Sequence, residues 1–211
     1  TCRDRPLLSA RPTDALRLDV ARAMGVTGPL AFTETGPLHA GRHIIDPDNL
    51  IQMTGDPVLR RIDTSDPAYL IASAHDDAAQ AITHVIRGED HVTNSGAQIE
   101  IFRAVGGDVP AMAHTPLLVG SDGSKLSKRL ESLSIRSLRD DGYEPLPIAS
   151  YLATIGTSDD TELGESLPAL AAKFDFEKFG RAPARFDEDE MRGLNADLIH
   201  GMEYATAKSR L

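Results

Sequence analysis

The sequence predicts an α/β fold that is followed, from about residue 140, by a smaller helical region. Three observations lead to this prediction. Helix-like, strand-like and loop-like segments alternate between residues 15 and 119, as is typical of α/β units. The segments after residue 140 read as helices. Apolar residues make up 41% of the 211 residues, which is enough for a folded core.

The first segments mix strand and turn signals. Residues 15–34 combine an alternating apolar stretch with a Gly/Pro break, which indicates a strand or short helix and then a turn. Residues 41–63 contain two Asp-Pro steps, and each disfavours helix at the residue before the proline. The end of this stretch, "PVLRRID" (57–63), is predicted to be a strand.

A helix, a strand and a second helix are expected between residues 68 and 107. The strand "AITHVIR" ends at Gly88. Residues 94–107 are predicted to form a helix that Asn94 or Ser95 caps and that Gly106 and Gly107 end. The apolar face of this helix consists of Ile99, Phe102 and Val105. Another strand is expected at residues 111–119, "AMAHTPLLV".

Three helices are expected in the later part, at residues 145–156, 166–180 and 187–204. The acidic run Asp187–Glu190 is predicted to be the solvated start of the last one, where carboxylates favour the helix dipole. From residue 141 onward the chain carries 14 acidic and 7 basic residues by count, so this region holds -7 of the formal net charge of -10.

The overall charge argues against a sequence-blind nucleic-acid binder, which would carry a basic face. The only cysteine, Cys2, excludes a disulfide framework, and the sequence does not support a zinc site within this chain. No apolar run has the length of a membrane span and no signal peptide is evident, so a cytoplasmic protein without a membrane partner is expected.

The segment "GSDGSKLSKR" (120–129) combines two glycines with Lys125 and Lys128. Glycines let backbone N–H groups approach a ligand, and lysines supply point charges suited to phosphate oxygens. The spacing does not fit a Walker A loop. The alternative is a hairpin turn at Asp122-Gly123, between strands "PLLV" and "KLS", with its lysines in solvent.

Several segments in the same order resemble glutamyl-tRNA synthetases of class I. "GSDGSKLSKR" is similar to their lysine-rich signature loop, and "HVIRGEDHVTN" (84–94) to the stretch that precedes it. "SIRSLRDDGYEPLPIASYLATIGTSD" resembles the segment after the loop, and "FDFEKFGRAPARFDEDEMRGLNADLIH" the stem-contact helices. The resemblance covers most of residues 15–200. It implies part of a Rossmann-type nucleotide-binding domain with an acceptor-region remnant in residues 1–140, and a helical stem-contact domain in residues 141–211.

The resemblance implies that the loop closes on ATP, which Mg²⁺ accompanies, and stabilises the leaving pyrophosphate. Lys128 matches the principal ATP-contacting lysine and Lys125 a supporting one. Ser127 belongs to the same loop, and the adenine would rest near the backbone of Leu118. Charge placed where charge develops is the physical basis of this role.

The resemblance also implies a glutamate pocket. Arg87 matches the arginine that pairs with the substrate carboxylate, although an ion pair with Glu89 or Asp90 is the structural alternative. Tyr69 matches a tyrosine that lines the pocket, and its alternative is an ordinary core tyrosine. Ser73 stands where an Asn is frequent, which leaves the details of the pocket open.

Three histidines, His84, His91 and His114, fit no metal-binding motif, so structural roles or polar contacts in the ATP site are expected. Two further departures concern the family pattern: Ala81 stands where a Gly is frequent, and Cys2 resembles the last ligand of a zinc segment that some relatives carry.

The family's His-x-Gly-His signature, which binds ATP, does not occur in the sequence, and neither does the anticodon-binding domain. The chain also starts without Met. We therefore expect a fragment of a longer synthetase, or a chain that another chain completes, and no adenylate formation by the 211 residues alone.

The expected function is ATP-dependent ligation of glutamate to tRNA(Glu) through a glutamyl-adenylate, by an enzyme that is monomeric when complete. Two alternatives stay open. One is a glutamyl-queuosine tRNA(Asp) synthetase-like enzyme that modifies an anticodon base, and the other is a non-catalytic tRNA-binding paralogue. Because the helical region is acidic, tRNA contacts are expected from local basic residues such as Arg181, Arg185 and Arg192.

Overall fold

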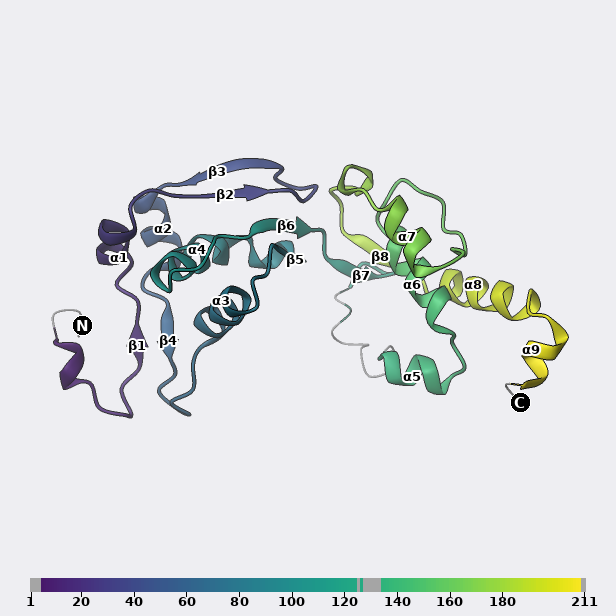
Figure 1. Cartoon of the computed structure of the whole chain (residues 1–211), viewed down its shortest axis with the longest axis horizontal. Coiled ribbons are helices and arrows are strands. Elements are labelled where there is room, and N and C mark those ends of the chain that lie inside the picture. Colours follow the sequence, from purple (N-terminus) through teal and green to yellow (C-terminus); the bar gives the residue numbers. More distant parts are fainter. Residues whose placement is uncertain (1–4, 125, 127–133, 210–211) are drawn as a thin grey trace. The chain divides into compact units, whose positions relative to one another are not determined.

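A computed structural model of the chain describes residues 5–124, 126 and 134–209. It forms two compact units, Thr1–Thr115 and Pro116–Leu211 (Figure 1). The division expected at residue 140 on functional grounds lies inside the second unit. That functional division remains a prediction.

A mixed four-stranded sheet organises the first unit (Figure 1). Its strands, in the order β3-β2-β6-β5, are Gly41–Ile45, Leu30–Glu34, Ala111–Thr115 and His84–Gly88. The hairpin of β2 and β3 is antiparallel, whereas β6 runs parallel to both β2 and β5. A separate antiparallel ladder joins β1 (Leu16–Arg17) to β4 (Val58–Arg60). The α/β class predicted from the sequence is therefore confirmed.

Two of the helices described in this unit begin at an aspartate that caps them. The helices are α1 (Val20–Thr27), α2 (Pro47–Thr54), α3 (Tyr69–Ala79) and α4 (Ser95–Ala104), with short 3-10 helices η1 (Leu7–Ser9) and η2 (Glu89–Asn94). Asp19 and Asp46 each accept a hydrogen bond from a backbone N–H in the first turn of α1 and α2. At the Asp46-Pro47 step, Asp46 is extended and Pro47 opens the helix, a position that proline tolerates well.

Helix α4 lies at the centre of the first unit and buries seven of its ten residues. Its Ile99 packs with Val20, Met24, Leu30, Leu50 and Met112, which come from α1, β2, α2 and β6. Ile101 and Phe102 pack with Ala74 of α3. These contacts join the sheet to α1, α2 and α3 through a single helix. Burial of the apolar side chains stabilises the unit by about 25 cal/mol per Å².

Three sequence-based expectations for this region were wrong in detail. Val105 is 45% exposed, because the helix ends before it and its side chain leaves the apolar face. Asn94 makes no capping hydrogen bond; its side-chain amide contacts the ring of His91 instead. The strand expected at 111–119 is broken at Pro116, which has no N–H for a ladder, so its two parts enter different sheets.

The second unit is mainly helical (Figure 1). Its elements are β7 (Leu118–Gly120), α5 (Ile135–Asp140), α6 (Pro145–Thr154), α7 (Leu167–Lys173), η4 (Phe176–Lys178), β8 (Ala184–Phe186), α8 (Glu188–His200) and α9 (Tyr204–Ser209). The core consists of Leu138, Ile148, Tyr151, Met191 and Leu194. The Tyr151 hydroxyl accepts a hydrogen bond of 2.6 Å from the N–H of Asp187, which fixes the start of α8.

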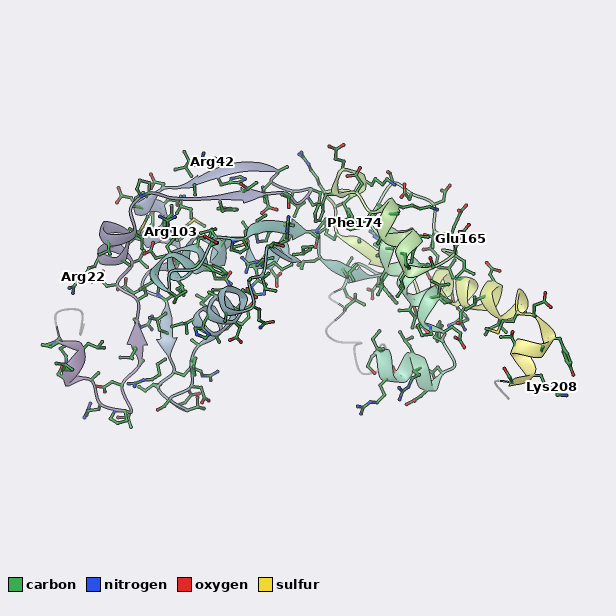
Figure 2. All side chains as sticks on the ribbon, viewed as in Figure 1. Arg22, Arg42, Arg103, Glu165, Phe174 and Lys208 are labelled. Atoms are coloured by element: carbon green, nitrogen blue, oxygen red, sulfur yellow. The ribbon has the colours of Figure 1, made fainter. Side chains whose placement is uncertain are left out.

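The sequence anticipated α6, α7 and α8, with two errors in their ends: the helix expected over 187–204 ends at His200, and α7 also ends early. The acidic start of α8 is confirmed: Asp187 caps the helix and three acidic residues occupy its first turn. The helix expected over 166–180, in contrast, ends at Lys173. Beyond it the rings of Phe174, Phe176 and Phe179 pack together at centroid distances of 5.0 to 6.3 Å, and Figure 2 labels Phe174 directly after α7.

The acidic residue of α4, Glu100, is buried, and this burial should affect the stability of the fold. It has no solvent exposure, and the Thr27 hydroxyl lies 2.9 Å from its Oε1 atom. Burial raises the pKa of Glu100 against the opposing effects of Thr27 and Arg103. A raised folded-state pKa stabilises the fold below the unfolded-state value of about 4.3, and this contribution is lost as the pH rises through the folded-state pKa.

We therefore expect Glu100→Gln to raise the free energy of unfolding at pH 7 by about 1 kcal/mol, with a smaller gain at pH 4. The amide keeps the shape and a hydrogen bond to Thr27 without a charge. Urea denaturation at both pH values measures the effect, with Asp108→Asn as the exposed control. A loss of stability at pH 7 would contradict this account of Glu100.

Candidate functional site

The guanidinium of Arg87 on β5 is the centre of a polar network in the first unit. Its Nε atom donates to Nε2 of His114 at 3.1 Å. Its Nη2 atom donates to the carbonyl of His91 at 3.2 Å and to Oγ of Ser95 at 2.9 Å. Its Nη1 atom donates to Oε1 of Gln98. Four of the five N–H donors are therefore directed at these acceptors, and the Tyr69 hydroxyl interacts with the same guanidinium.

The ion pair of Arg87 with Glu89 or Asp90, the alternative to a role in substrate binding, is not formed. Glu89 and Asp90, both within the described part of the chain, make no ion pair with Arg87. The acceptors around it are neutral side chains and one carbonyl, so no carboxylate among the described residues contacts the guanidinium at this half-buried position. Burial is the largest effect on the pKa of Arg87 and lowers it, although an arginine remains charged throughout the physiological range.

Behind Arg87 lies a buried pair, His114 on β6 and Glu34 at the end of β2. The Nδ1 atom of His114 is 2.6 Å from Oε2 of Glu34, and both side chains are 1% exposed. The Oε1 atom of Glu34 accepts hydrogen bonds from the backbone N–H groups of His114, at 2.7 Å, and Gly36, at 2.9 Å. The β2–β6 ladder has a single residue pair, Glu34 with Met112, so the carboxylate continues the pairing where the backbones separate.

The electrostatics of this pair favour an ionised Glu34 and a neutral His114. Burial acts to raise the pKa of Glu34, but the hydrogen bonds from the His114 side chain, the His114 N–H and the Gly36 N–H together lower it. Burial lowers the pKa of His114 and outweighs the opposite influence of Glu34, and Arg87 acts in the same direction as burial. Neutral His114 can therefore accept from Arg87 at Nε2.

Tyr69 and Ser73, both predicted to line a glutamate pocket, lie on α3 in the same network. Gln98 links Ser73 to Arg87, because its Nε2 atom donates to Oγ of Ser73 at 2.9 Å while its Oε1 atom accepts from Arg87. Tyr69 is 57% exposed, so it is not an ordinary core tyrosine. Its ring packs against the ring of His91 at 5.6 Å, and its hydroxyl is close enough to affect the pKa of Arg87.

The remaining predicted site residues belong to the second unit. Leu118 lies in β7 and is 40% exposed. Lys125, Ser127 and Lys128 lie outside the described residues. Before them, the N–H of Gly120 donates to the carbonyl of Ser124 at 2.8 Å and closes a turn around Asp122 and Gly123. β7 pairs with β8 in parallel. The hairpin alternative needs Lys125 and Ser127 of "KLS", which lie outside the described residues, so it stays a prediction.

Other possible sites are less developed. A pocket of about 520 Å³ in the second unit lies beside α6 and α7, and none of the predicted site residues lines it. Among residues 5–124, 126 and 134–209 there is no group of three or more His, Cys, Asp or Glu side chains placed to hold a metal ion, and Cys2 is outside these ranges. No helix in this part of the chain is long and apolar enough to cross a membrane.

Sequence reasoning did not find Glu34, Ser95 or Gln98 as members of the network. Glu34 is separated from His114 by 80 positions, and only the sheet pairing brings them together. A weak signal existed for Gln98 and Glu100, two polar residues on the otherwise apolar face of the α4 sequence. His114 was predicted to be structural or a polar contact in the ATP site. It is a buried polar contact to Arg87 and Glu34, and any contact with ATP stays a prediction.

Comparison with known proteins places the chain in a family. Residues 41–192 match the family described as tRNA synthetases class I (E and Q), catalytic domain. The chain belongs to this family. The match spans Arg87 and its direct hydrogen-bond partners, β7, the loop after it and most of the second unit, whereas Glu34 precedes it.

The relatives are named as glutamate–tRNA ligases. Glutamate--tRNA ligase 2 of Hyphomonas neptunium is 56% identical over 156 residues, which are 74% of this chain and 35% of that protein. Glutamate--tRNA ligase 2 of Methylobacterium sp. strain 4-46 is 45% identical over 203 residues, covering 95% of this chain and 42% of the relative. The chain thus spans well under half the length of the curated relatives it matches.

Solved structures support the fold assignment. The glutamate-tRNA synthetase of Elizabethkingia anophelis superposes with a TM-score of 0.63 at 24% identity, over 87% of this chain and 42% of that structure. At this identity the likeness concerns the fold. A mixed α/β class I synthetase fold, as predicted from the sequence, is therefore confirmed independently of sequence identity.

The buried pair of Glu34 and His114 leaves no space for a side chain at Gly36. A Cβ atom there would lie 2.5 Å from the N atom of His114 and 2.6 Å from Oε1 of Glu34. We expect Gly36→Ala to separate these groups and to lower the free energy of unfolding by about 3 kcal/mol, the usual range for breaking a buried charged network.

The matched control is Gly25→Ala in α1, where a Cβ atom meets nothing within 4 Å. Because alanine is the better helix former, this change should stabilise the protein by up to about 1 kcal/mol. Urea denaturation of both variants compares them directly. Equal stability of the two variants would show that the Gly36 site has room to adapt.

Proposed function

We propose that this chain provides the glutamate-recognition residues and the lysine-containing loop of a glutamate–tRNA ligase. Such an enzyme joins glutamate to ATP, forming glutamyl-adenylate and pyrophosphate, and then transfers the glutamyl group to the 3′ end of tRNA(Glu). The observation that carries the proposal is the charged Arg87, which no carboxylate in the described part of the chain contacts, in a chain of the class I (E and Q) synthetase family.

The geometry around Arg87 suits a substrate carboxylate. The half-buried positive charge lies beside the exposed Tyr69, and a charge-assisted hydrogen bond to a carboxylate is stronger than a neutral one. The exposed Tyr69 supplies a hydroxyl beside it. Ser73, held by Gln98, supplies a second hydroxyl on the same helix. The proposed pocket therefore recognises an acidic side chain by one arginine and two hydroxyl groups.

The ATP side of the proposal rests on the loop after β7. Lys128 would contact the phosphates, with Lys125 and Ser127 in support and the adenine near the backbone of Leu118. Mg²⁺ accompanies ATP in this scheme. Positive charge near the departing pyrophosphate stabilises the charge that develops as the adenylate forms.

The partner in the second step is tRNA, and the proposed enzyme acts in the cytoplasm as a monomer. The relatives reported above carry the name glutamate--tRNA ligase. This favours charging of the tRNA 3′ end over modification of an anticodon base. Retention of the Arg87 network favours an active enzyme over a non-catalytic tRNA-binding paralogue.

The test of the proposed pocket is glutamate binding by the 211-residue protein. We expect saturation-transfer NMR to detect L-glutamate with a Kd on the order of 1 mM, and Arg87→Lys to weaken it by about tenfold, because lysine cannot reproduce the placed N–H donors. L-glutamine is the matched ligand without the charge.

The control variant is Arg22→Lys on the exposed surface of α1, labelled in Figure 2. It should leave glutamate binding unchanged. Equal binding of glutamate by the wild type and by Arg87→Lys would remove Arg87 from the pocket and with it the proposal.

The tRNA contacts generate a second prediction, in which the three arginines considered above differ. Arg192 is paired with Asp189 at 2.5 Å and with Glu188 at 3.4 Å. Arg181 is exposed, and Arg185 donates to the Ser121 carbonyl at 3.4 Å. The last two are therefore better placed to contact phosphates.

We expect Arg181→Glu and Arg185→Glu together to weaken tRNA binding by about tenfold or more and to reduce its salt dependence, since each phosphate contact contributes about one unit of slope. Arg192→Glu should have a smaller effect. Filter binding at several salt concentrations measures both. The same loss for Arg192→Glu would point to net charge as the cause.

A further inference from the structure

We infer that Glu34 is a positioning residue that acts on Arg87 through His114: its carboxylate selects the His114 tautomer that can accept the Arg87 Nε proton. This inference extends the proposed function, because it matters for glutamate only if Arg87 meets the substrate. The assignment of a role to Glu34 rests on the hydrogen-bond directions in the buried network.

The first step is the acceptor-only character of the Glu34 carboxylate. Its Oε1 atom already accepts two backbone N–H groups, those of His114 and Gly36. Its Oε2 atom lies 2.6 Å from Nδ1 of His114. Since an ionised carboxylate has no proton to give, Nδ1 must carry the proton in this hydrogen bond.

The second step concerns the other side of the imidazole. A neutral ring with its proton on Nδ1 has a free lone pair on Nε2. Two donors face that atom, namely the Nε–H of Arg87 at 3.1 Å and the hydroxyl of Ser95 at 3.3 Å. The direction of donation therefore runs from Arg87 to His114 to Glu34, and the first hydrogen bond depends on the second, because Glu34 keeps the proton on Nδ1.

The third step considers the charge at Arg87. If the proton moved to Nε2, two N–H groups would face each other at 3.1 Å beside a cation, with no acceptor between them. Arg87 would then have to turn away, and with it the contacts to Ser95 and Gln98. Glu34 does not contact the guanidinium directly. Through His114 it thus holds the Arg87 side chain in its observed orientation.

The decisive variant is Glu34→Gln. Its Oε1 atom can still accept the backbone N–H groups of His114 and Gly36, so its amide N–H₂ must face Nδ1 of His114. Because an amide nitrogen can only donate, Nδ1 must become the acceptor and the proton must move to Nε2. The matched control is Glu100→Gln, the same substitution at a buried glutamate of the first unit that contacts Thr27 instead.

The experiment measures the ¹⁵N chemical shifts of the His114 ring in the ligand-free 211-residue protein, assigned by comparison with His114→Gln. We expect the Nδ1–H tautomer in the wild type and in Glu100→Gln, and the Nε2–H tautomer in Glu34→Gln. The Arg87 Nε–H should exchange with solvent at least about tenfold faster in Glu34→Gln alone.

Two results would overturn the inference. One is an Nε2–H tautomer in the wild type, which needs no variant and so remains informative if Glu34→Gln does not fold. The other is a Glu34→Gln protein that keeps both the Nδ1–H tautomer and the slow Arg87 exchange. Glu34→Asp, which restores the carboxylate, should recover the wild-type tautomer.

Glutamate affinity is measured separately. If the tautomer switches and affinity falls by about tenfold, both the inference and the proposed function stand. If the tautomer switches while glutamate binds no more weakly, the positioning role in substrate binding fails although the network is as described. If the wild type binds no glutamate, the proposed pocket fails and the tautomer result still stands.

Discussion

The hydrogen bond between Glu34 and His114 is the buried polar contact on which the candidate site of the first unit depends. A carboxylate that is 1% exposed would be too costly without donors, and this one receives three. A single backbone hydrogen bond is worth about 1 kcal/mol, whereas removing one partner of a buried charge costs about 3–5 kcal/mol. The pair therefore fixes β2 against β6 more firmly than their single backbone pair can.

Helix α4 connects this constraint to both the core and the site. Through Ile99 and Phe102 it anchors the apolar clusters of the first unit, and through Ser95 and Gln98 it holds the guanidinium of Arg87. Because the same rigid helix carries both sets of side chains, a change in core packing would move the donors and acceptors around Arg87. Substitutions that alter the packing of α4 should consequently change both the stability of the first unit and the geometry of the candidate site.

Local signals in the sequence were sufficient for many elements and insufficient for their partners. The strand that ends at Gly88 and the helix that comes after it were predicted from alternation, apolar spacing and glycines. The exposure of Val105 and the break at Pro116 were not, because each depends on where a neighbouring segment packs. β8 was missed entirely, since its three residues become a strand only by pairing with β7.

The candidate site shows the same limit. The resemblance identified Arg87, Tyr69 and Ser73, which lie in one network. No local sequence pattern indicates a role for Glu34 or Gln98. Partners separated by 80 positions can be recognised only once the sheet order is known. Lys125, Ser127 and Lys128 lie outside the described residues, and their roles stay predictions.

The separation of Glu34 from His114 has a consequence for the way the polypeptide acquires its structure. During synthesis from the N-terminus, the hairpin of β2 and β3 is available long before β6 has been made. Until then Glu34 remains hydrated, and its charge opposes premature burial of the end of β2 in the collapsing chain. Docking of β6 then brings the donors that the carboxylate lacks, so closure of the sheet and desolvation of the charge become a single late event. Non-local pairing of this kind is slow to form, and here it leaves the Arg87 site unassembled until almost the whole first unit has emerged.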